Sequence, residues 1–171
     1  MYVGILTGPF SGEPLEVVAA FAGEYSFGGL EIVAGPGSKH IDTNNFGAAQ
    51  AQALRDLMDK RALQISAVAA YSNLTDADPE RRKTNIQTVR NAIDAAVLLE
   101  VEVVCTLAGL PPAGKDRYKT IEEDCTEVFP PLLEYAQSKG IKIAMENWYA
   151  TNIQHLGHWS RLFELVPNAN F

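Results

Sequence analysis

The chain has 171 residues, with 14 basic and 21 acidic side chains and a formal net charge of −7. Its 47% hydrophobic and 20% charged residues are typical of a single soluble globular domain and exclude a disordered chain. The acidic balance lacks the basic footprint of a nucleic-acid binder, and no apolar run approaches the roughly 18 residues that a membrane span needs. We therefore expect neither nucleic acid nor a membrane as a partner.

The N-terminus and the two cysteines favour a cytoplasmic protein. The first residues, MYVGILTGPFSGEP, carry no basic segment before their short apolar run, which indicates a first strand rather than a signal peptide. Cys105 and Cys125 lie far apart without a C-x-x-C motif, so we expect two buried, reduced thiols.

Short β-like apolar runs alternate with amphipathic helical stretches along the whole chain. In chain order, the pattern predicts a strand at 2–7, a helix at 14–25, a strand at 29–34, a helix at 46–61, a strand at 63–70, a helix at 78–100, a strand at 101–107, a helix at 120–139, a strand at 141–147 and a helix at 155–166. Asp78 is the expected N-cap of the third helix, and a capping box begins at Thr120. Pro130 and Pro131 should kink or split the fourth helix.

This alternation predicts parallel strands with right-handed crossovers. Four strands begin apolar–polar–apolar, so Glu31, Gln64, Glu102 and Lys142 would lie at matching heights, with Lys142 paired to Glu102. The mouth of a barrel holds such a polar layer more readily than a sheet that is covered on both faces. Five units of about 34 residues imply about 270 residues for eight, near the barrel norm of roughly 250. The favoured fold is therefore an incomplete (β/α)8 TIM barrel, with residues 1–171 as one domain that forms its N-terminal five-eighths.

The fifth predicted strand ends in a carboxylate, Glu146. By parity with Lys142 and Ala144, Glu146 points inward and reaches the C-terminal mouth, where (β/α)8 enzymes keep their active sites. A glutamate that ends a buried strand costs free energy unless it is paired or binds a metal ion, and carboxylate oxygens suit Mg²⁺ and Mn²⁺ and tolerate Zn²⁺ or Co²⁺. A loop cap or an ion pair with a basic residue is the competing interpretation.

Four segments share their order and spacing with a known family: Gly29-Leu30-Glu31-Ile32, the loop 71–79 with Arg81-Arg82 after it, the helix-to-strand join at 95–104, and the IAxEN stretch at 143–147. In these segments the chain resembles the xylose isomerase-like TIM barrels, the sugar phosphate isomerases and epimerases that share their fold with endonuclease IV. The resemblance spans essentially the whole chain.

The resemblance implies a metal-dependent isomerase or epimerase that acts on a sugar or sugar phosphate by moving a proton next to a carbonyl. It makes Glu146 both a catalytic residue and the first of four ligands of a divalent Mn, Mg, Co or Zn ion. In the family an aspartate, a histidine and a second glutamate follow on strands six to eight, and these have no counterpart in this chain. The chain by itself is therefore expected to be inactive.

Further candidate contacts to the substrate lie on loops at the same mouth: His40, Tyr71, Asn73, Lys115, Trp148 and Asn152. An aromatic wall with amide or ammonium donors suits a polyol. Ketohexose epimerases of the family often carry a glutamate at the position of Asn152, which makes that substrate less favoured. Loop packing or a solvated charge is the competing interpretation for each residue. His155 and His158 are expected at the surface or as caps of the last helix.

Two other functions stay open, and so does a homo-oligomeric assembly. The chain could be a complete flavodoxin-like module that binds a cofactor, although Pro9 and Glu13 fit a phosphate-binding loop poorly. It could also be a non-catalytic partial barrel that pairs with a second chain. Residues 167–171 look like a loop that leads to a sixth strand, so we expect the barrel to continue beyond them.

Overall fold

A single parallel sheet forms the centre of the molecule in the computed structural model, which describes residues 1–171. Its strands are β1 (Gly4–Leu6), β2 (Gly29–Gly35), β3 (Ile41–Asp42), β4 (Gln64–Ala69), β5 (Val103–Leu107) and β6 (Lys142–Glu146). The order across the sheet is β1-β2-β4-β5-β6, and the short β3 pairs with the end of β2. Every strand pair is parallel.

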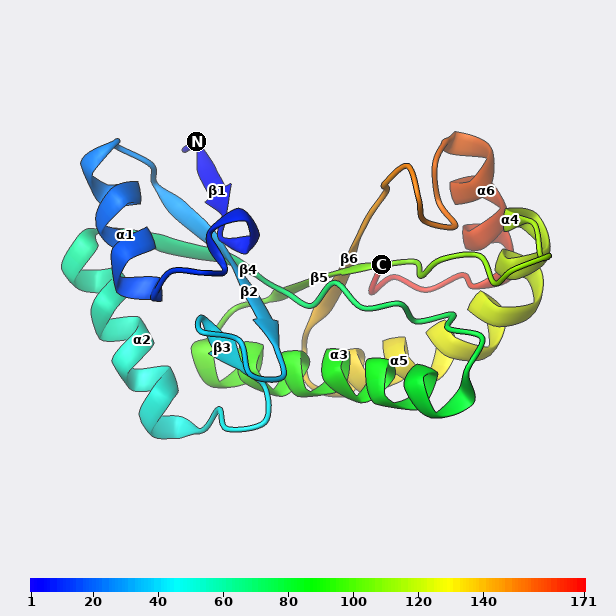
Figure 1. Cartoon of the computed structure of the whole chain (residues 1–171), viewed down its shortest axis with the longest axis horizontal. Helices are drawn as coiled ribbons and strands as arrows, with labels where there is room; N and C mark the ends of the chain where they lie inside the picture. Colours follow the sequence, from blue (N-terminus) through cyan, green and yellow to red (C-terminus); the bar gives the residue numbers. More distant parts are fainter.

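Helices connect the strands and cover one side of the sheet. They are η1 (Gly8–Phe10), α1 (Leu15–Glu24), α2 (Ala48–Arg61), α3 (Pro79–Leu99), α4 (Arg117–Thr120), the π-helix η2 (Ile121–Cys125), α5 (Thr126–Ser138) and α6 (Leu156–Leu165). Helices α1 and α2 lie at one end of the molecule, α3 and α5 run along the sheet, and α4 and α6 lie at the other end (Figure 1). None of these helices combines the length and the apolar composition that a bilayer crossing needs.

The strand order decides between the two folds that the sequence left open. The strands follow one another across the sheet in chain order, apart from the short β3, so each crossover advances in the same direction and leaves its helix on the same face. A doubly wound flavodoxin-like sheet reverses its order and has helices on both faces. The fold is therefore a partial (β/α)8 barrel, and the flavodoxin-like alternative is wrong.

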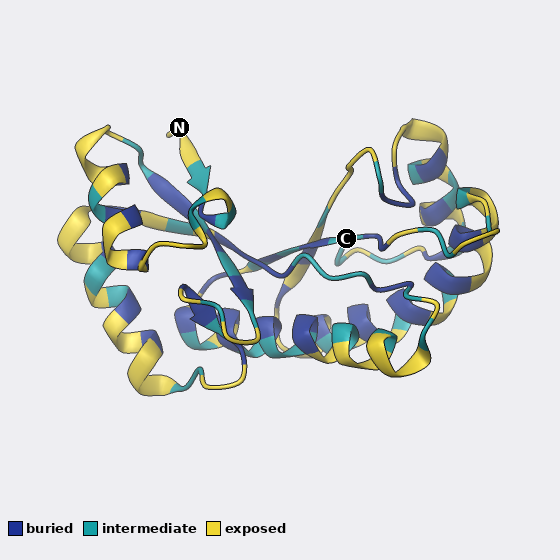
Figure 2. Ribbon diagram, viewed as in Figure 1, coloured by how far each residue is buried: buried dark blue, intermediate teal, exposed yellow.

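Burial along the strands shows the same asymmetry between the two faces. In β2, Leu30, Ile32 and Ala34 are buried against the helices, whereas Glu31 and Val33 on the other face are only half-buried. The helices likewise bury the face toward the sheet and expose the opposite one (Figure 2). One cluster of 36 buried hydrophobic residues fills the space between sheet and helices. The other face of the sheet, the interior of the partial barrel, stays open.

The expected helix boundaries need two corrections. The fourth predicted helix begins at Arg117 rather than Thr120, because the Asp116 carboxylate accepts the Lys119 N–H at 2.9 Å and caps an earlier turn. Helix α5 also continues through Pro130 and Pro131. A proline has no N–H to donate to the carbonyl four residues before it. For Pro130 and Pro131 these carbonyls belong to the two residues directly after the π-helix η2, where the helical hydrogen-bond pattern already changes. The prolines therefore do not split α5.

The expected polar layer at the N-terminal mouth is wrong. A register shift between Leu30 and Glu31 places Glu31 opposite Ala67, while Gln64 pairs with Gly29. Lys142 lies opposite Val103 and forms no ion pair with Glu102; only its backbone N–H donates to the Glu102 carbonyl, at 2.8 Å. The bulge therefore moves Glu31 up the strand, toward the C-terminal half of the interior.

The last residues return to the edge of the sheet beside β6 (Figure 1). The Ile143 N–H donates to the Asn170 carbonyl at 2.7 Å, and the Asn170 side chain donates to the Ile141 carbonyl at 3.4 Å. Residues 167–171 thus lie where a neighbour of β6 would begin, although they are not a strand.

Candidate active site

The carboxylate of Glu146 ends β6 on the open face of the sheet. Its strand neighbours Lys142 and Ala144 are exposed on the same face, whereas Ile143 is buried against the helices. Glu146 lies opposite Leu107, the last residue of β5. The loops that follow β4, β5 and β6 begin at this level, so Glu146 lies at the C-terminal mouth of the partial barrel.

Three more side chains of the open face belong to the same neighbourhood. Cys105 lies opposite Ala69 on one side and Ala144 on the other. Ala144 is two residues before Glu146, so Cys105 points to the same face as Glu146, one side-chain level nearer the start of the strands. Tyr71 follows β4, and its phenol donates a hydrogen bond to Glu31 at 2.5 Å. Glu31, Tyr71, Cys105 and Glu146 thus come from four neighbouring βα units and form what we call the interior cluster.

Two acidic groups set the electrostatics of the interior cluster. Burial raises the pKa of Tyr71, and hydrogen bonding and charge from Glu31 and then Glu146 raise it further. Burial, the charge of Glu31 and a hydrogen bond to Glu31 raise the pKa of Cys105 to about 12, with a smaller effect of Glu146. Neither Glu31 nor Glu146 takes part in an ion pair. Glu31 therefore accepts from a neutral phenol rather than a cation, and Glu146 is exposed without an ion-pair partner.

The sequence predicts Glu31 in another layer and Cys105 as a buried thiol, whereas the structure brings Glu31 into the cluster and leaves Cys105 half-buried on the open face. The bulge that moves Glu31 into the cluster has no clear sequence signal, because Gln64-Ile65-Ser66-Ala67 alternates like an ordinary strand. For Cys105 a signal did exist: it shares strand parity with Val103, on the same face as Glu146.

Asn73 and Asn152 tie the loops together. The Asn152 amide donates to Thr75 Oγ1 at 3.0 Å and to the Ala108 carbonyl at 2.9 Å, and its side chain is fully buried. Asn73 Oδ1 accepts the Leu110 N–H at 2.7 Å. These amides link the loops after β4, β5 and β6, and their contact to a substrate stays a prediction.

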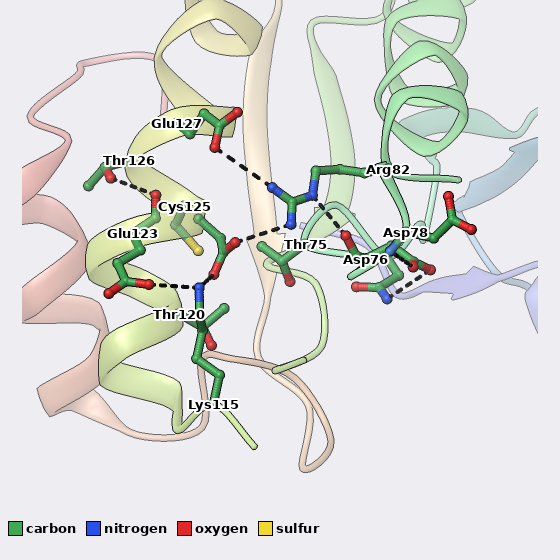
Figure 3. A network of polar contacts seen from close by, with 12 residues as sticks. Thr75, Asp76, Asp78, Arg82, Lys115, Thr120, Glu123, Cys125, Thr126 and Glu127 are labelled. Carbon is green, nitrogen blue, oxygen red and sulfur yellow. Dashed lines mark hydrogen bonds and ion pairs between the residues drawn. The ribbon is translucent and has the colours of Figure 1, made fainter. Parts of the chain in front are cut away.

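Lys115 lies in a network of ions outside the interior, which we call the outer network. Its ammonium forms ion pairs with Asp124 at 2.5 Å and with Glu123 at 2.8 Å. Asp124 also pairs with Arg82 at 3.1 Å, and Arg82 Nε donates to the Asp76 carbonyl at 2.8 Å. Figure 3 shows Lys115 directed toward the helical segment that carries Glu123, with Arg82 approaching it from the other side. These contacts occupy the side chain that the sequence proposed for substrate binding.

His40 is buried, and both of its ring nitrogens are bonded within the protein. Nε2 lies 3.1 Å from the Glu13 carbonyl and must donate to it, since a carbonyl only accepts. In the neutral ring Nδ1 then accepts from the Thr7 hydroxyl at 2.9 Å, and the Thr7 oxygen accepts the Val33 N–H at 2.9 Å. This chain of bonds joins the first loop to β2.

The loop after β6 carries Trp148, a residue that is 44% exposed and whose ring packs on that of Tyr149 with centroids 4.4 Å apart. His155 caps α6 by accepting the Gly157 N–H. His158, expected at the surface or as a cap, is instead 4% exposed, because it packs under the Tyr118 ring and accepts the Gln154 N–H. Burial lowers its pKa, and the nearby His155 and Arg117 lower it further.

A family model described as xylose isomerase-like TIM barrel matches residues 19–171. The chain belongs to this family. An uncharacterized protein of Methanocaldococcus jannaschii is 28% identical over 127 residues, which are 72% of this chain and 41% of that protein.

Solved structures of xylose isomerase-like barrels share the fold. A D-psicose 3-epimerase crystallised in the presence of D-fructose has a TM-score of 0.77 at 13% identity, covering 99% of this chain and 61% of that one. A xylose isomerase domain protein from Planctomyces limnophilus has a TM-score of 0.74 at 16% identity, with the same coverage. The IOLI protein, solved with a zinc atom, has a TM-score of 0.75 at 13% identity and covers 99% and 60%. The chain thus spans about three fifths of the length of these family structures.

Residues 1–171 do not contain a complete metal site. No group of three or more His, Cys, Asp or Glu side chains is arranged to hold an ion. Glu146 offers one exposed carboxylate without an ion-pair partner, which suits a single ligand position. The residues present therefore do not hold an ion by themselves, and a role of Glu146 as a metal ligand stays a prediction.

Proposed function

We propose that residues 1–171 are the N-terminal five-eighths of a metal-dependent isomerase or epimerase that acts on a sugar or sugar phosphate. The observation that carries the proposal is the position of Glu146, an unpaired carboxylate at the C-terminal mouth of a xylose isomerase-like barrel. Support comes from the fold neighbours, several of which are sugar 3-epimerases by name.

In this proposal the Glu146 carboxylate is one ligand of a divalent ion, Mn, Mg, Co or Zn, and stands beside the substrate carbon that loses its proton. The remaining ligands would come from further βα units. Tyr71 and Trp148 would line the substrate, because their polar or aromatic groups face the open mouth. Four other candidates would have to give up a hydrogen bond or an ion pair within the protein to contact the substrate: His40, Asn73, Lys115 and Asn152. A cytoplasmic location and a homo-oligomeric assembly stay predictions.

The test is exchange of a substrate proton for solvent deuterium, with D-fructose and D-psicose as first probes. A protein that contains the remaining βα units should catalyse the exchange, and Glu146→Gln should abolish it with an unchanged circular dichroism spectrum. Glu164→Gln is the matched control, because Glu164 is an exposed glutamate of α6 paired with Arg161, and it should retain full turnover.

Residues 1–171 alone should be silent in the same assay. Turnover by this chain alone, or by the complete Glu146→Gln protein, would contradict the proposal. A complete protein that exchanges no proton on any sugar or sugar phosphate would instead favour the non-catalytic partial barrel.

A further inference from the structure

Tyr71 is approached by carboxylates from two distant strands. Its phenol donates to Glu31 of β2 at 2.5 Å. Glu146 of β6 points to the same open face and, after burial and Glu31, also raises the pKa of Tyr71. Strands β2 and β6 are separated by β4 and β5, so the tyrosine spans the interior of the partial barrel.

The Tyr71 phenol has only one proton to donate. A phenol carries a single O–H and two lone pairs, whereas an ionised carboxylate can only accept. With its proton committed to Glu31, the Tyr71 oxygen can offer Glu146 and the mouth nothing but lone pairs. The side of the phenol that faces the mouth is therefore an acceptor.

The bond to Glu31 is not needed to hold the loop after β4. That loop is fixed by the Thr75 hydroxyl on the Leu110 carbonyl at 2.8 Å, by Arg82 Nε on the Asp76 carbonyl at 2.8 Å, and by the Asn85 amide on the Asn73 carbonyl at 2.9 Å. Holding a half-buried carboxylate without a cation costs free energy. Loop anchoring therefore does not account for Glu31.

We propose that Glu31 is a positioning residue of the candidate site, whose carboxylate accepts the hydrogen bond of the Tyr71 O–H and so leaves the phenol oxygen as an acceptor beside Glu146. The ligand group that fits this acceptor is a hydroxyl of a polyol rather than a carboxylate or a fully ionised phosphate. This inference rests on the proposed function for its ligand, but the placement of the proton does not. Without Glu31, the phenol turns its proton to Glu146 and occupies a lone pair of that carboxylate.

Nuclear magnetic resonance of the protein labelled with ¹³C at tyrosine Cζ tests where the proton lies. The Tyr71 signal is assigned by its loss in Tyr71→Phe, and its shift reports whether the phenol donates. Glu31→Leu should move this signal, Glu31→Gln should move it less because the amide oxygen still accepts, and Glu146→Gln should leave it in place. A signal that moves in Glu146→Gln but not in Glu31→Leu would overturn the proposal. If Glu31→Leu does not fold, the comparison of the two glutamine variants decides.

Kinetics of a protein with the complete barrel give a second readout. Tyr71→Phe should raise KM about fivefold, the value of one neutral hydrogen bond, with kcat close to wild type. Glu31→Leu should also lower kcat, and the Glu31→Leu/Tyr71→Phe double variant should recover it, because no phenol proton is left to bond Glu146. A double variant no faster than Glu31→Leu would overturn the positioning role. An absence of any sugar turnover with the expected resonance shifts would refute only the proposed function.

Discussion

Two groups of carboxylates in this molecule have opposite surroundings. In the outer network, Asp124 is buried and pairs with the cations of Arg82 and Lys115. In the interior cluster, Glu31 and Glu146 face Tyr71 and Cys105, and no cation pairs with either. The charge of a buried carboxylate that is paired with cations is already neutralised within the protein. Carboxylates without such partners remain available to a ligand, and here they lie at the mouth of the barrel.

The sharpest test of this contrast removes one charge from each group without changing side-chain shape. Asp124→Asn should lower the free energy of unfolding by about 2–3 kcal/mol, because Arg82 and Lys115 lose their shared buried partner and keep only the exposed carboxylates of Glu127 and Glu123. Glu31→Gln should change it by less than about 1 kcal/mol, since Glu31 has no ion-pair partner and the amide oxygen can still accept from Tyr71. Urea unfolding followed by circular dichroism measures both values. A larger loss in Glu31→Gln would break the distinction between the two groups.

The loops between the two groups should be rigid where they touch. Gly109 has a φ of +84°, and a Cβ there would collide with Thr75 Oγ1 and lie 2.7 Å from the Thr75 nitrogen. Gly109→Ala should therefore cost about 2–3 kcal/mol, from backbone strain and displacement of Thr75 together.

Gly114 provides the matched control, because its φ is +79° but a Cβ would meet nothing within 4 Å. Gly114→Ala should cost only about 1 kcal/mol, the strain of the left-handed backbone alone. Equal losses in both variants, measured by urea unfolding, would show that the contact of Gly109 with Thr75 contributes nothing.

The smallest expected effect concerns the two cysteines, one beside each group. Burial raises the pKa of Cys105 and that of Cys125 to about 12, so both should react with a thiol reagent near pH 8 on the order of a thousandfold more slowly than a free thiol. Glu31→Gln should speed Cys105 several-fold, because the charge of Glu31 contributes to its raised pKa. Cys125 should keep its rate, since its acidic neighbour is Asp124. Mass spectrometry of the labelled protein distinguishes the two sites, and equal acceleration of both would point to general loosening instead.

Much of the fold follows from local signals in the sequence. Asp78 accepts the N–H groups of Glu80 and Arg81 at 2.9 and 3.2 Å, as expected of an N-cap. Gly140 follows α5 with a φ of +71°. The strand at 2–7 is shorter than expected, and the two-residue β3 was not predicted, because so short a pairing depends on a distant strand and not on its own residues.

The sequence by itself determined the alternation of strands and helices, the parity that directs Glu146 to the open face, and the family resemblance. Only the tertiary structure decided that the strands run in chain order across the sheet, that a bulge lifts Glu31 toward Tyr71, and that Asn152, Lys115 and His40 are bonded within the protein. The physical reason is the separation along the chain of the residues that interact. Caps and strand parity depend on residues a few positions apart, whereas register and side-chain partners depend on segments that only folding brings together.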